Sequence, residues 1–96
     1  VINFAALAYV GESMVEPLRY YRANVAGMIT LIEVMRKHEV GSLVFSSSCA
    51  TYGVPDRLPV VEGMLQQPIN TYGRTKLMGE QILRDSCAAH GLGAMA

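Results

Sequence analysis

The chain has 96 residues, of which 51% are hydrophobic and 17% charged, and its formal net charge is zero. This composition is typical of a globular protein and excludes the disordered and low-complexity classes. Lys and Arg form no dense cluster, so we predict neither a nucleic-acid partner nor a membrane partner. The longest nearly apolar run, residues 25–32, is too short to cross a bilayer, which takes about 20 helical residues.

The cysteines and the chain ends suggest the setting of the protein. Cys49 and Cys87 are too few for a disulfide framework and have no CxxC spacing, so a reducing, cytoplasmic location is the default expectation. The chain starts in an apolar segment without an initiator Met or a signal sequence, and it closes on a Gly-containing turn. We therefore expect a piece of a larger protein, with the next strand beyond residue 96.

The first half of the chain predicts a strand and a helix. Residues 1–5 have the length of a buried strand, and residues 9–16 are typical of a Gly-containing loop. Pro17 suits the first position of a helix, where its missing N–H is not needed. From there to Lys37 and His38, apolar residues recur at intervals of three and four, which indicates one amphipathic helix. Its apolar stripe consists of Leu18, Tyr21, Val25, Met28, Ile29, Ile32 and Met35.

The second half predicts a strand, a long loop and another helix. Residues 42–46 are apolar and favour a buried strand, whereas residues 52–68 contain three Pro and two Gly. Irregular loops of that length in compact domains are usually functional. Asn70 is a good N-cap for the second helix, and Gly91 is a good C-terminal stop. The apolar face of this helix consists of Leu77, Met78, Ile82, Leu83 and Cys87.

Alternating strands and helices predict the α/β class, here a partial doubly wound, Rossmann-like parallel sheet with crossover helices. Ligands of such folds bind at the carboxyl ends of the strands. Those ends are Phe4–Ala6 and Ser46–Ser48, and the helix with Tyr72 and Lys76 follows the second. We therefore expect the polar candidates to meet at one edge of the sheet.

Tyr72 and Lys76 form the first candidate pair for chemistry. Residues at positions i and i+4 share one helix face and lie about 6 Å apart along the axis, so both side chains can reach one ligand. An ammonium close to a tyrosine favours the phenolate, which can accept a proton. The spacing alone is weak, because two amphipathic residues on an ordinary helix give the same pattern.

Several short segments around this pair match one known pattern. They are Phe4–Ala6, Ala8–Ser13, Tyr20–Tyr21, Asn24–Val25, Phe45–Gly53, Pro68–Asn70 and Tyr72–Lys76. Over essentially its whole length the chain resembles the extended short-chain dehydrogenase/reductase family, in its UDP-glucose (UDP-galactose) 4-epimerase branch. The resemblance implies that residues 1–96 are the central part of an NAD-binding Rossmann-like domain.

This resemblance implies an isomerase that inverts C4 of a UDP-hexose through transient oxidation to a 4-keto sugar, with NAD as cofactor and without a metal. Tyr72 would be the catalytic acid/base on the sugar 4-hydroxyl. Lys76 would hold the nicotinamide ribose and favour the Tyr72 phenolate. Ser48 would bind the reacting hydroxyl and help to relay its proton, so Ser48 and Tyr72 would be the substrate contacts.

The resemblance also implies a set of cofactor contacts. Two members have alternatives, because Asn24 could be a buried structural hydrogen bonder and Ser46, like Ser47, could satisfy backbone groups at a strand end. Ser13, with its neighbour Glu12, is more typical of a helix cap than of a substrate contact. The implied cofactor contacts are Phe4, Ala5, Ala6, Leu7, Ala8, Asn24, Ser46, Tyr72 and Lys76.

The chain departs from the family pattern in two residues and lacks two of its parts. Asn3 stands where relatives usually have His, and Thr71 stands where they usually have Pro, which loosens the entry to the helix. There is no GxGxxG segment for the pyrophosphate and no carboxy-terminal part for the uridine nucleotide. We therefore predict that these 96 residues alone neither hold NAD tightly nor turn over substrate, and that the complete enzyme is a homodimer.

Other functions stay open. Nucleotide-sugar 4,6-dehydratases need an Asp-Glu pair where this chain has Ser48, Cys49 and Ala50, so this alternative is disfavoured. Epimerases of UDP-xylose and UDP-arabinose, or of N-acetylated sugars, would share all the residues above. A non-catalytic or truncated NAD-binding relative is the alternative from another class.

Overall fold

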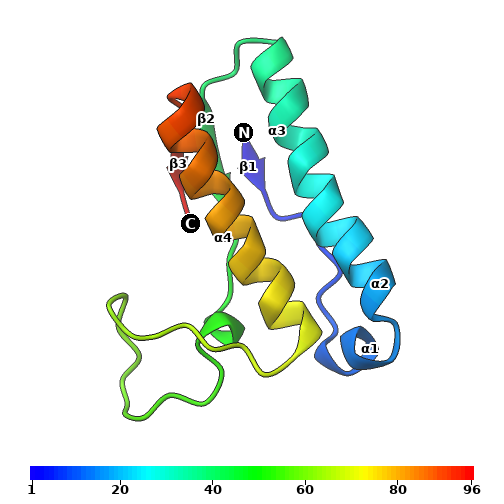
Figure 1. The fold of residues 1–96 in the computed structure, drawn as a ribbon, viewed down its shortest axis with the longest axis vertical. Helices are drawn as coiled ribbons and strands as arrows, with labels where there is room; N and C mark the ends of the chain where they lie inside the picture. The colour runs from blue at the N-terminus through cyan, green and yellow to red at the C-terminus, as the bar shows by residue number, and fades with distance from the viewer.

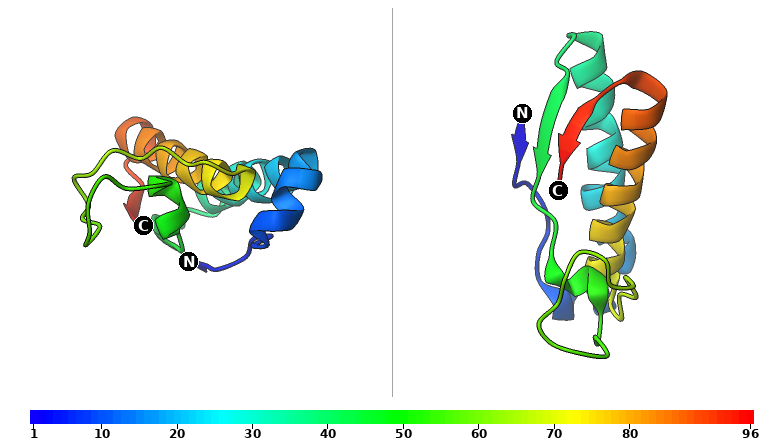
Figure 2. Two further views of the ribbon diagram at one scale, coloured as in Figure 1. Left: turned by 90° about the horizontal axis from the view of Figure 1, so that it is seen from below. Right: turned by 90° about the vertical axis from the view of Figure 1, so that its left-hand side faces the viewer.

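Three parallel strands and two long helical segments form the two layers of the molecule, and the computed structural model describes residues 1–96 (Figure 1). The strands β1 (Ile2–Asn3), β2 (Ser42–Phe45) and β3 (Gly93–Met95) lie in the order β1-β2-β3. Both pairings are parallel. The predicted α/β fold with a parallel sheet and crossover helices is confirmed. Figure 2 shows the helices on one face of the sheet.

The core lies between β2 and the helices. Alternate residues of β2 point to opposite faces, so Leu43 and Phe45 are buried whereas Val44 is exposed beside its register partners Ile2 and Met95. The Phe45 ring lies so close to the last helix that a Cβ at Gly79 would come within 2.8 Å of it. The main core consists of Met28, Ile32, Met35, Leu43, Phe45, Leu83 and Leu92.

The first segments differ from the prediction in two ways. The strand is shorter than residues 1–5, because the chain leaves the sheet after Asn3. The loop predicted for residues 9–16 is wrong, since α1 (Val10–Val15) occupies most of it. A short helix with a Gly has little intrinsic stability, but Ser13 is fully buried against the last helix. Tertiary packing therefore fixes a helix that local propensity does not predict.

The predicted helix from Pro17 to about Lys37 is present, but it is built from three parts. These are α2 (Pro17–Tyr20), the π-helical turn η1 (Tyr21–Ala26) and α3 (Gly27–Lys37). Of the predicted stripe, Met28, Ile32 and Met35 in α3 are buried, whereas Ile29 is 44% and Leu18 79% exposed. The π turn changes the periodicity, because each of its turns contains an additional residue.

The second half agrees better with the prediction. The 3-10 turn η2 (Cys49–Tyr52) follows β2, and α4 (Thr71–His90) begins after the irregular residues 53–70. Gly91 ends α4 in the left-handed conformation with φ of 67°, as expected of a C-cap. The following strand, predicted beyond residue 96, is instead β3 inside the chain. Ser42 and Gly93 pair in register, which places β3 beside β2.

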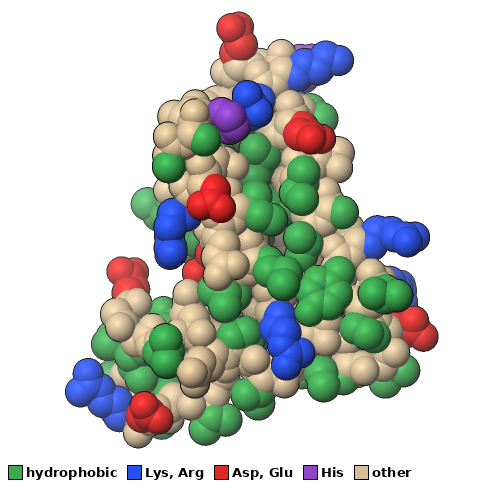
Figure 3. Space-filling model, in the orientation of Figure 1, with side chains coloured by type: hydrophobic (Ala, Val, Ile, Leu, Met, Phe, Trp, Pro, Cys, Tyr) green, Lys and Arg blue, Asp and Glu red, His purple; other side chains and the backbone are tan.

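The outer side of the helical layer carries an apolar seam. Figure 3 shows hydrophobic side chains gathered between α3 and α4, where Ile29, Ile32 and Ile82 line the groove.

Cys49 and Cys87 are both free thiols. None of the helices combines the length and the apolar character that a membrane span requires.

Candidate functional site

The amino-terminal end of α4 is held by two side chains from different parts of the sequence. As predicted, Asn70 caps the helix, and its Oδ1 accepts the Gly73 N–H at 2.7 Å. Ser13 Oγ of α1 accepts the N–H of Tyr72 at 3.1 Å. Thr71 is buried, and its hydroxyl lies 3.8 Å from Met14 Sδ. These contacts fix the first turn although Thr71, and not Pro, stands before Tyr72.

Tyr72 has a fixed backbone and a free phenol. Its carbonyl accepts a hydrogen bond from Thr75 Oγ1 at 2.7 Å, and its N–H is bound by Ser13. Gly73 beside it touches η2 so closely that a Cβ would lie 2.5 Å from the Ala50 carbonyl oxygen. The half-buried phenol has no hydrogen-bond partner within the chain and is therefore available to a ligand.

Lys76 is the most buried charged residue at this edge of the sheet. Only 4% of it is exposed, and its Nζ donates a hydrogen bond of 2.7 Å to the Ser46 carbonyl at the end of β2. The ammonium lies 4.9 Å from the centre of the Phe45 ring and 5.8 Å from that of the Tyr72 ring. Burial lowers the pKa of Lys76, because desolvation disfavours the charged amine. The predicted Tyr72 and Lys76 side chains are therefore neighbours.

Asn24 joins three segments from within the π turn. Its Oδ1 accepts the Leu7 N–H at 2.9 Å, and its Nδ2 donates to the Leu7 carbonyl at 2.9 Å. The same Nδ2 donates to Thr75 Oγ1 at 3.0 Å. The amide thus holds the loop after β1 in place, which matches the structural alternative for Asn24 rather than a free cofactor contact.

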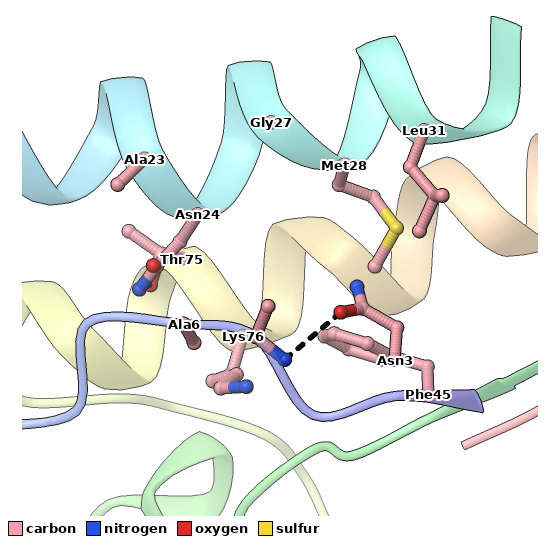
Figure 4. A pocket seen from close by; sticks show the side chains of 11 residues that line it. Asn3, Ala6, Ala23, Asn24, Gly27, Met28, Leu31, Phe45, Thr75 and Lys76 are labelled. Atoms are coloured by element: carbon pink, nitrogen blue, oxygen red, sulfur yellow. Dashed lines mark hydrogen bonds between the residues drawn. The ribbon is translucent and has the colours of Figure 1, made fainter. Parts of the chain in front are cut away.

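A cavity of about 230 Å³ lies between the loop after β1, α3 and α4 (Figure 4). Ala5, Ala6 and Lys76 contribute to its wall, and Asn3 turns its side chain toward the loop to accept the Ala5 N–H at 3.0 Å. The volume is below the roughly 300–1,000 Å³ of a typical ligand pocket. The complete lining is Asn3, Ala5, Ala6, Ala23, Asn24, Gly27, Met28, Leu31, Phe45, Thr75 and Lys76.

Ser48 lies in the wall of a second, wider cavity. Its Oγ accepts the Ala50 N–H at 3.2 Å, and its carbonyl accepts the hydroxyl of the buried Thr51 at 2.9 Å, so it caps η2. The cavity measures about 590 Å³ and also involves Tyr52, Gln66 and Glu80. No hydrogen bond joins Ser48 to Tyr72 or Lys76 within the chain.

The remaining predicted cofactor contacts are Phe4, Leu7, Ala8 and Ser46. The Phe4 side chain is 76% exposed and Ala8 is also exposed, whereas Leu7 is bound through its backbone. Ser46 contributes its carbonyl to Lys76 rather than its hydroxyl.

Sequence reasoning missed Thr75, the link between Asn24 and the backbone of Tyr72, and considered Ser13 only as a local cap. Neither partnership has a signal in the local sequence, because each joins residues more than 50 positions apart.

A second tyrosine, Tyr20, lies in the corner between α1 and α2. It is fully buried, its hydroxyl donates to Glu12 Oε2 at 2.7 Å, and it accepts the Tyr9 N–H at 3.1 Å. Burial, followed by the hydrogen bond to the Glu12 carboxylate, raises the pKa of Tyr20. Arg19 Nη1 binds the other oxygen of Glu12 at 2.6 Å. Tyr20 is thus a neutral structural donor.

Comparisons with known proteins add a family. The NAD dependent epimerase/dehydratase family matches residues 1–96. The chain is 52% identical over 92 residues to UDP-glucose 4-epimerase of Streptococcus mutans, covering 96% of this chain and 28% of that protein. It is 51% identical over 85 residues to the probable UDP-arabinose 4-epimerase 1 of Oryza sativa, covering 88% of this chain and 20% of that protein.

A solved structure gives the same result. The crystal structure of UDP-glucose 4-epimerase from Brucella ovis in complex with NAD matches 98% of this chain with a TM-score of 0.96 and 55% identity. That match covers 29% of the Brucella ovis chain, so the present chain spans less than a third of the length of these relatives. With a family match over its full length, the chain belongs to the NAD-dependent epimerase/dehydratase family.

Proposed function

We propose that this chain is the catalytic segment of an NAD-dependent UDP-hexose 4-epimerase and forms the central part of its Rossmann-like domain. The observation that carries the proposal is the arrangement on α4. The Lys76 ammonium is buried 5.8 Å from the ring centre of Tyr72, whose phenol has no partner within the chain. The pair lies where β2 ends, at the edge of a parallel sheet where ligands bind.

The side chains present fit NAD. A lysine ammonium has three donors, and Lys76 uses one of them on the Ser46 carbonyl, so two remain for ribose hydroxyls. Ala5 and Ala6 have small side chains beside Lys76, which lets a flat ring approach the backbone. The cavity of about 230 Å³ is too small for a whole dinucleotide. This chain would therefore supply the nicotinamide end, and the remaining parts of the enzyme would supply the rest.

The proposed chemistry uses the pair as a proton shuttle. NAD, when bound, would accept the hydride from C4 of the sugar and return it. Tyr72 takes the proton of the 4-hydroxyl as the C4–H bond breaks, which leaves a 4-keto sugar. The same phenol returns the proton to O4 when the hydride comes back on the opposite face. Lys76 favours the phenolate throughout by its charge, and Ser48 would bind O4 once substrate occupies the wider cavity.

The sugar is the part of the proposal with an alternative. The relatives include a UDP-glucose 4-epimerase at 52% identity and a probable UDP-arabinose 4-epimerase at 51%, so the segment is compatible with either substrate. We favour UDP-glucose and UDP-galactose, because the solved structure with 55% identity is a UDP-glucose 4-epimerase. Assays of the complete enzyme with UDP-glucose and UDP-galactose, and with UDP-xylose and UDP-arabinose, would decide between the two substrate classes. They require the complete enzyme because, in our proposal, the residues that contact the sugar beyond C4 lie outside this segment.

A chimera provides the test. In this chimera the present chain replaces the segment that it matches in the Brucella ovis UDP-glucose 4-epimerase. We expect it to bind NAD and to convert UDP-galactose to UDP-glucose, because 55% identity at a TM-score of 0.96 preserves the packing. The 96-residue chain alone is titrated with NAD in parallel by calorimetry, and we expect no tight binding.

The outcomes separate folding from function. A chimera that melts cooperatively and retains NAD but does not epimerise UDP-galactose would contradict the proposed function. The matched control is the same chimera with Tyr72→Phe, which keeps the ring and removes the hydroxyl. Unchanged turnover in this control would show that Tyr72 is not the acid/base.

We extend the proposal to the homodimer. Apolar side chains of α3 and α4 are exposed, among them Ile29, Val34 and Met78. Burying such a surface against a second copy would stabilise a dimer by the hydrophobic effect. Light scattering on the chimera should give twice the protomer mass, and Ile29→Glu should shift the protein toward the monomer if this surface is the interface.

A further inference from the structure

Glu80 lies on the same face of α4 as Tyr72 and Lys76, two turns after the first and one turn after the second. Lys76 Nζ donates to the Ser46 carbonyl, and the hydroxyl of Ser47 donates to Glu80 Oε1. Two successive turns of α4 therefore bind two successive residues at the end of β2. The next residue is Ser48, the proposed contact of the sugar hydroxyl.

The second oxygen of Glu80 binds another segment. Gln66 Nε2 donates to Glu80 Oε2 at 2.9 Å and to Thr51 Oγ1 at 3.2 Å. Thr51 is 1% exposed and belongs to η2, and Gln66 belongs to the irregular residues before α4. The carboxylate is thus the point where the end of β2, η2, the long loop and α4 meet.

The environment of Glu80 is suited to holding these segments. The side chain is half-buried, and hydrogen bonds to a charged acceptor are about twice as strong as neutral ones. The only ion pair of the structure, Arg19 with Glu12, lies elsewhere, so Glu80 is satisfied by neutral donors. Each of its oxygens accepts a hydrogen bond from a side chain of another segment, so the carboxylate is engaged in holding these segments together.

We propose that Glu80 is a positioning residue that fixes Ser48 and the wall of the wider cavity against the Tyr72–Lys76 pair. This inference rests on the proposed function. Ser47, Ser48, Gln66 and Glu80 all line the cavity of about 590 Å³, so loss of the carboxylate frees one side of the cavity at two points, Ser47 and Gln66. A displacement of about 1 Å at a reacting group can cost on the order of 100-fold in rate.

The experiment compares variants of the chimera. Glu80→Ala removes both hydrogen bonds, and we expect kcat for UDP-galactose to fall about 10- to 100-fold while NAD retention stays within about 2-fold. Glu80→Gln keeps the shape, because the Ser47 hydroxyl can rotate to accept while the amide oxygen accepts from Gln66. It should recover kcat to within about 3-fold of the parent, with an unchanged pH profile. Asp85→Ala is the matched control, an exposed acid on the same helix.

A second readout does not depend on activity. Hydrogen exchange of residues 47–52 and 64–67 should accelerate in Glu80→Ala and not in Asp85→Ala, because Glu80 orders these segments. If Glu80→Ala fails to fold, Ser47→Ala and Glu80→Gln carry the same comparison with smaller expected effects. If the parent chimera melts cooperatively and retains NAD but is inactive, the proposed function fails, and the exchange pattern still tests the role of Glu80.

Two results would overturn the inference. One is a Glu80→Ala chimera with kcat and exchange both at the parental level. The other is a Glu80→Gln chimera as slow as Glu80→Ala that has also lost a limb of its pH profile. That result would assign proton chemistry to the carboxylate in place of positioning.

Discussion

Tyr20 and Tyr72 have the same side chain in two different regions. In the corner of α1 and α2, Tyr20 is fully buried and its hydroxyl is bound on both sides, by Glu12 and by the Tyr9 N–H. At the start of α4 the backbone of Tyr72 is fixed and its hydroxyl is free. A carboxylate beside Tyr20 favours its neutral form, whereas an ammonium lies beside Tyr72. The neighbouring charge and the presence or absence of hydrogen-bond partners for the hydroxyl, rather than the residue type, distinguish a structural tyrosine from a candidate catalytic one.

The largest expected effect separates the two tyrosines. In the chimera, Tyr72→Phe should lower kcat by about 100- to 10,000-fold, the contribution of a positioned acid/base, and leave the melting temperature unchanged. Tyr20→Phe should do the reverse, because it removes a donor to a partly buried carboxylate, with a fall of a few degrees in melting temperature and kcat nearly unchanged. Steady-state rates and thermal melts of the two variants test this directly. Equal losses of rate would remove the distinction.

The ammonium beside Tyr72 should have the next largest effect. Lys76→Met keeps the length and removes the charge, so kcat should fall on the order of 100-fold. NAD retention should weaken as well, because the two free donors of the ammonium are lost. Lys37→Met, at the exposed end of α3, is the control. A Lys76→Met chimera with parental kcat would show that the charge does not assist the phenol.

Ser13 connects the two regions and should have a moderate effect. Ser13→Ala leaves the N–H of Tyr72 without its acceptor in a buried place, which should cost about 1–2 kcal/mol of unfolding free energy. The first turn of α4 then loosens, so kcat should fall by less than in Tyr72→Phe. Denaturant unfolding measures the first quantity. The adjacent exposed Met14→Ala, which loses only a weak sulfur contact, is the comparison.

The smallest effect is a pH dependence of stability. Burial lowers the pKa of Lys76 below the ordinary lysine value of 10.5. Between the two values the unfolded chain binds the proton and the folded chain does not, so unfolding free energy rises with pH in that window. Below this window Lys76 is charged in both states, so the folded chain carries the full free-energy cost of burying the ammonium. The stability difference between Lys76→Met and the parent should therefore shrink as pH rises toward 10.5, and a constant difference would contradict the lowered pKa.

The sequence was sufficient for the elements whose signals are local. Asn70 and Gly91 bound α4 as expected, because capping and the left-handed C-cap depend on the residue at the terminus. The strand predicted at residues 42–46 is present as β2 (Ser42–Phe45), because a short β-favouring run is also a local signal. The i, i+4 spacing predicted that Tyr72 and Lys76 are neighbours, which the structure confirms with 5.8 Å between Lys76 Nζ and the centre of the Tyr72 ring, and the resemblance added the roles implied for them.

The sequence was insufficient where contacts between distant segments decide. The α1 helix depends on Ser13 binding α4, and the π turn contains Asn24, which binds Leu7. Leu18 has the spacing of a core residue and lies in solvent, since the change of period in η1 rotates the helix face before α3. Glu80 has no local pattern at all, because its partners lie 14 and 33 residues away.

The two side chains that hold the first turn of α4, Ser13 and Asn70, also determine whether its N–H groups are available to an anion. The amino-terminal end of a helix carries partial positive charge and often binds phosphate through free N–H groups. In this chain the Tyr72 and Gly73 N–H groups already donate to Ser13 and Asn70, and the Arg74 N–H donates to the Asn70 carbonyl. The Tyr72 and Gly73 N–H groups at the start of α4 are therefore occupied by acceptors of the protein itself and are not available to a phosphate.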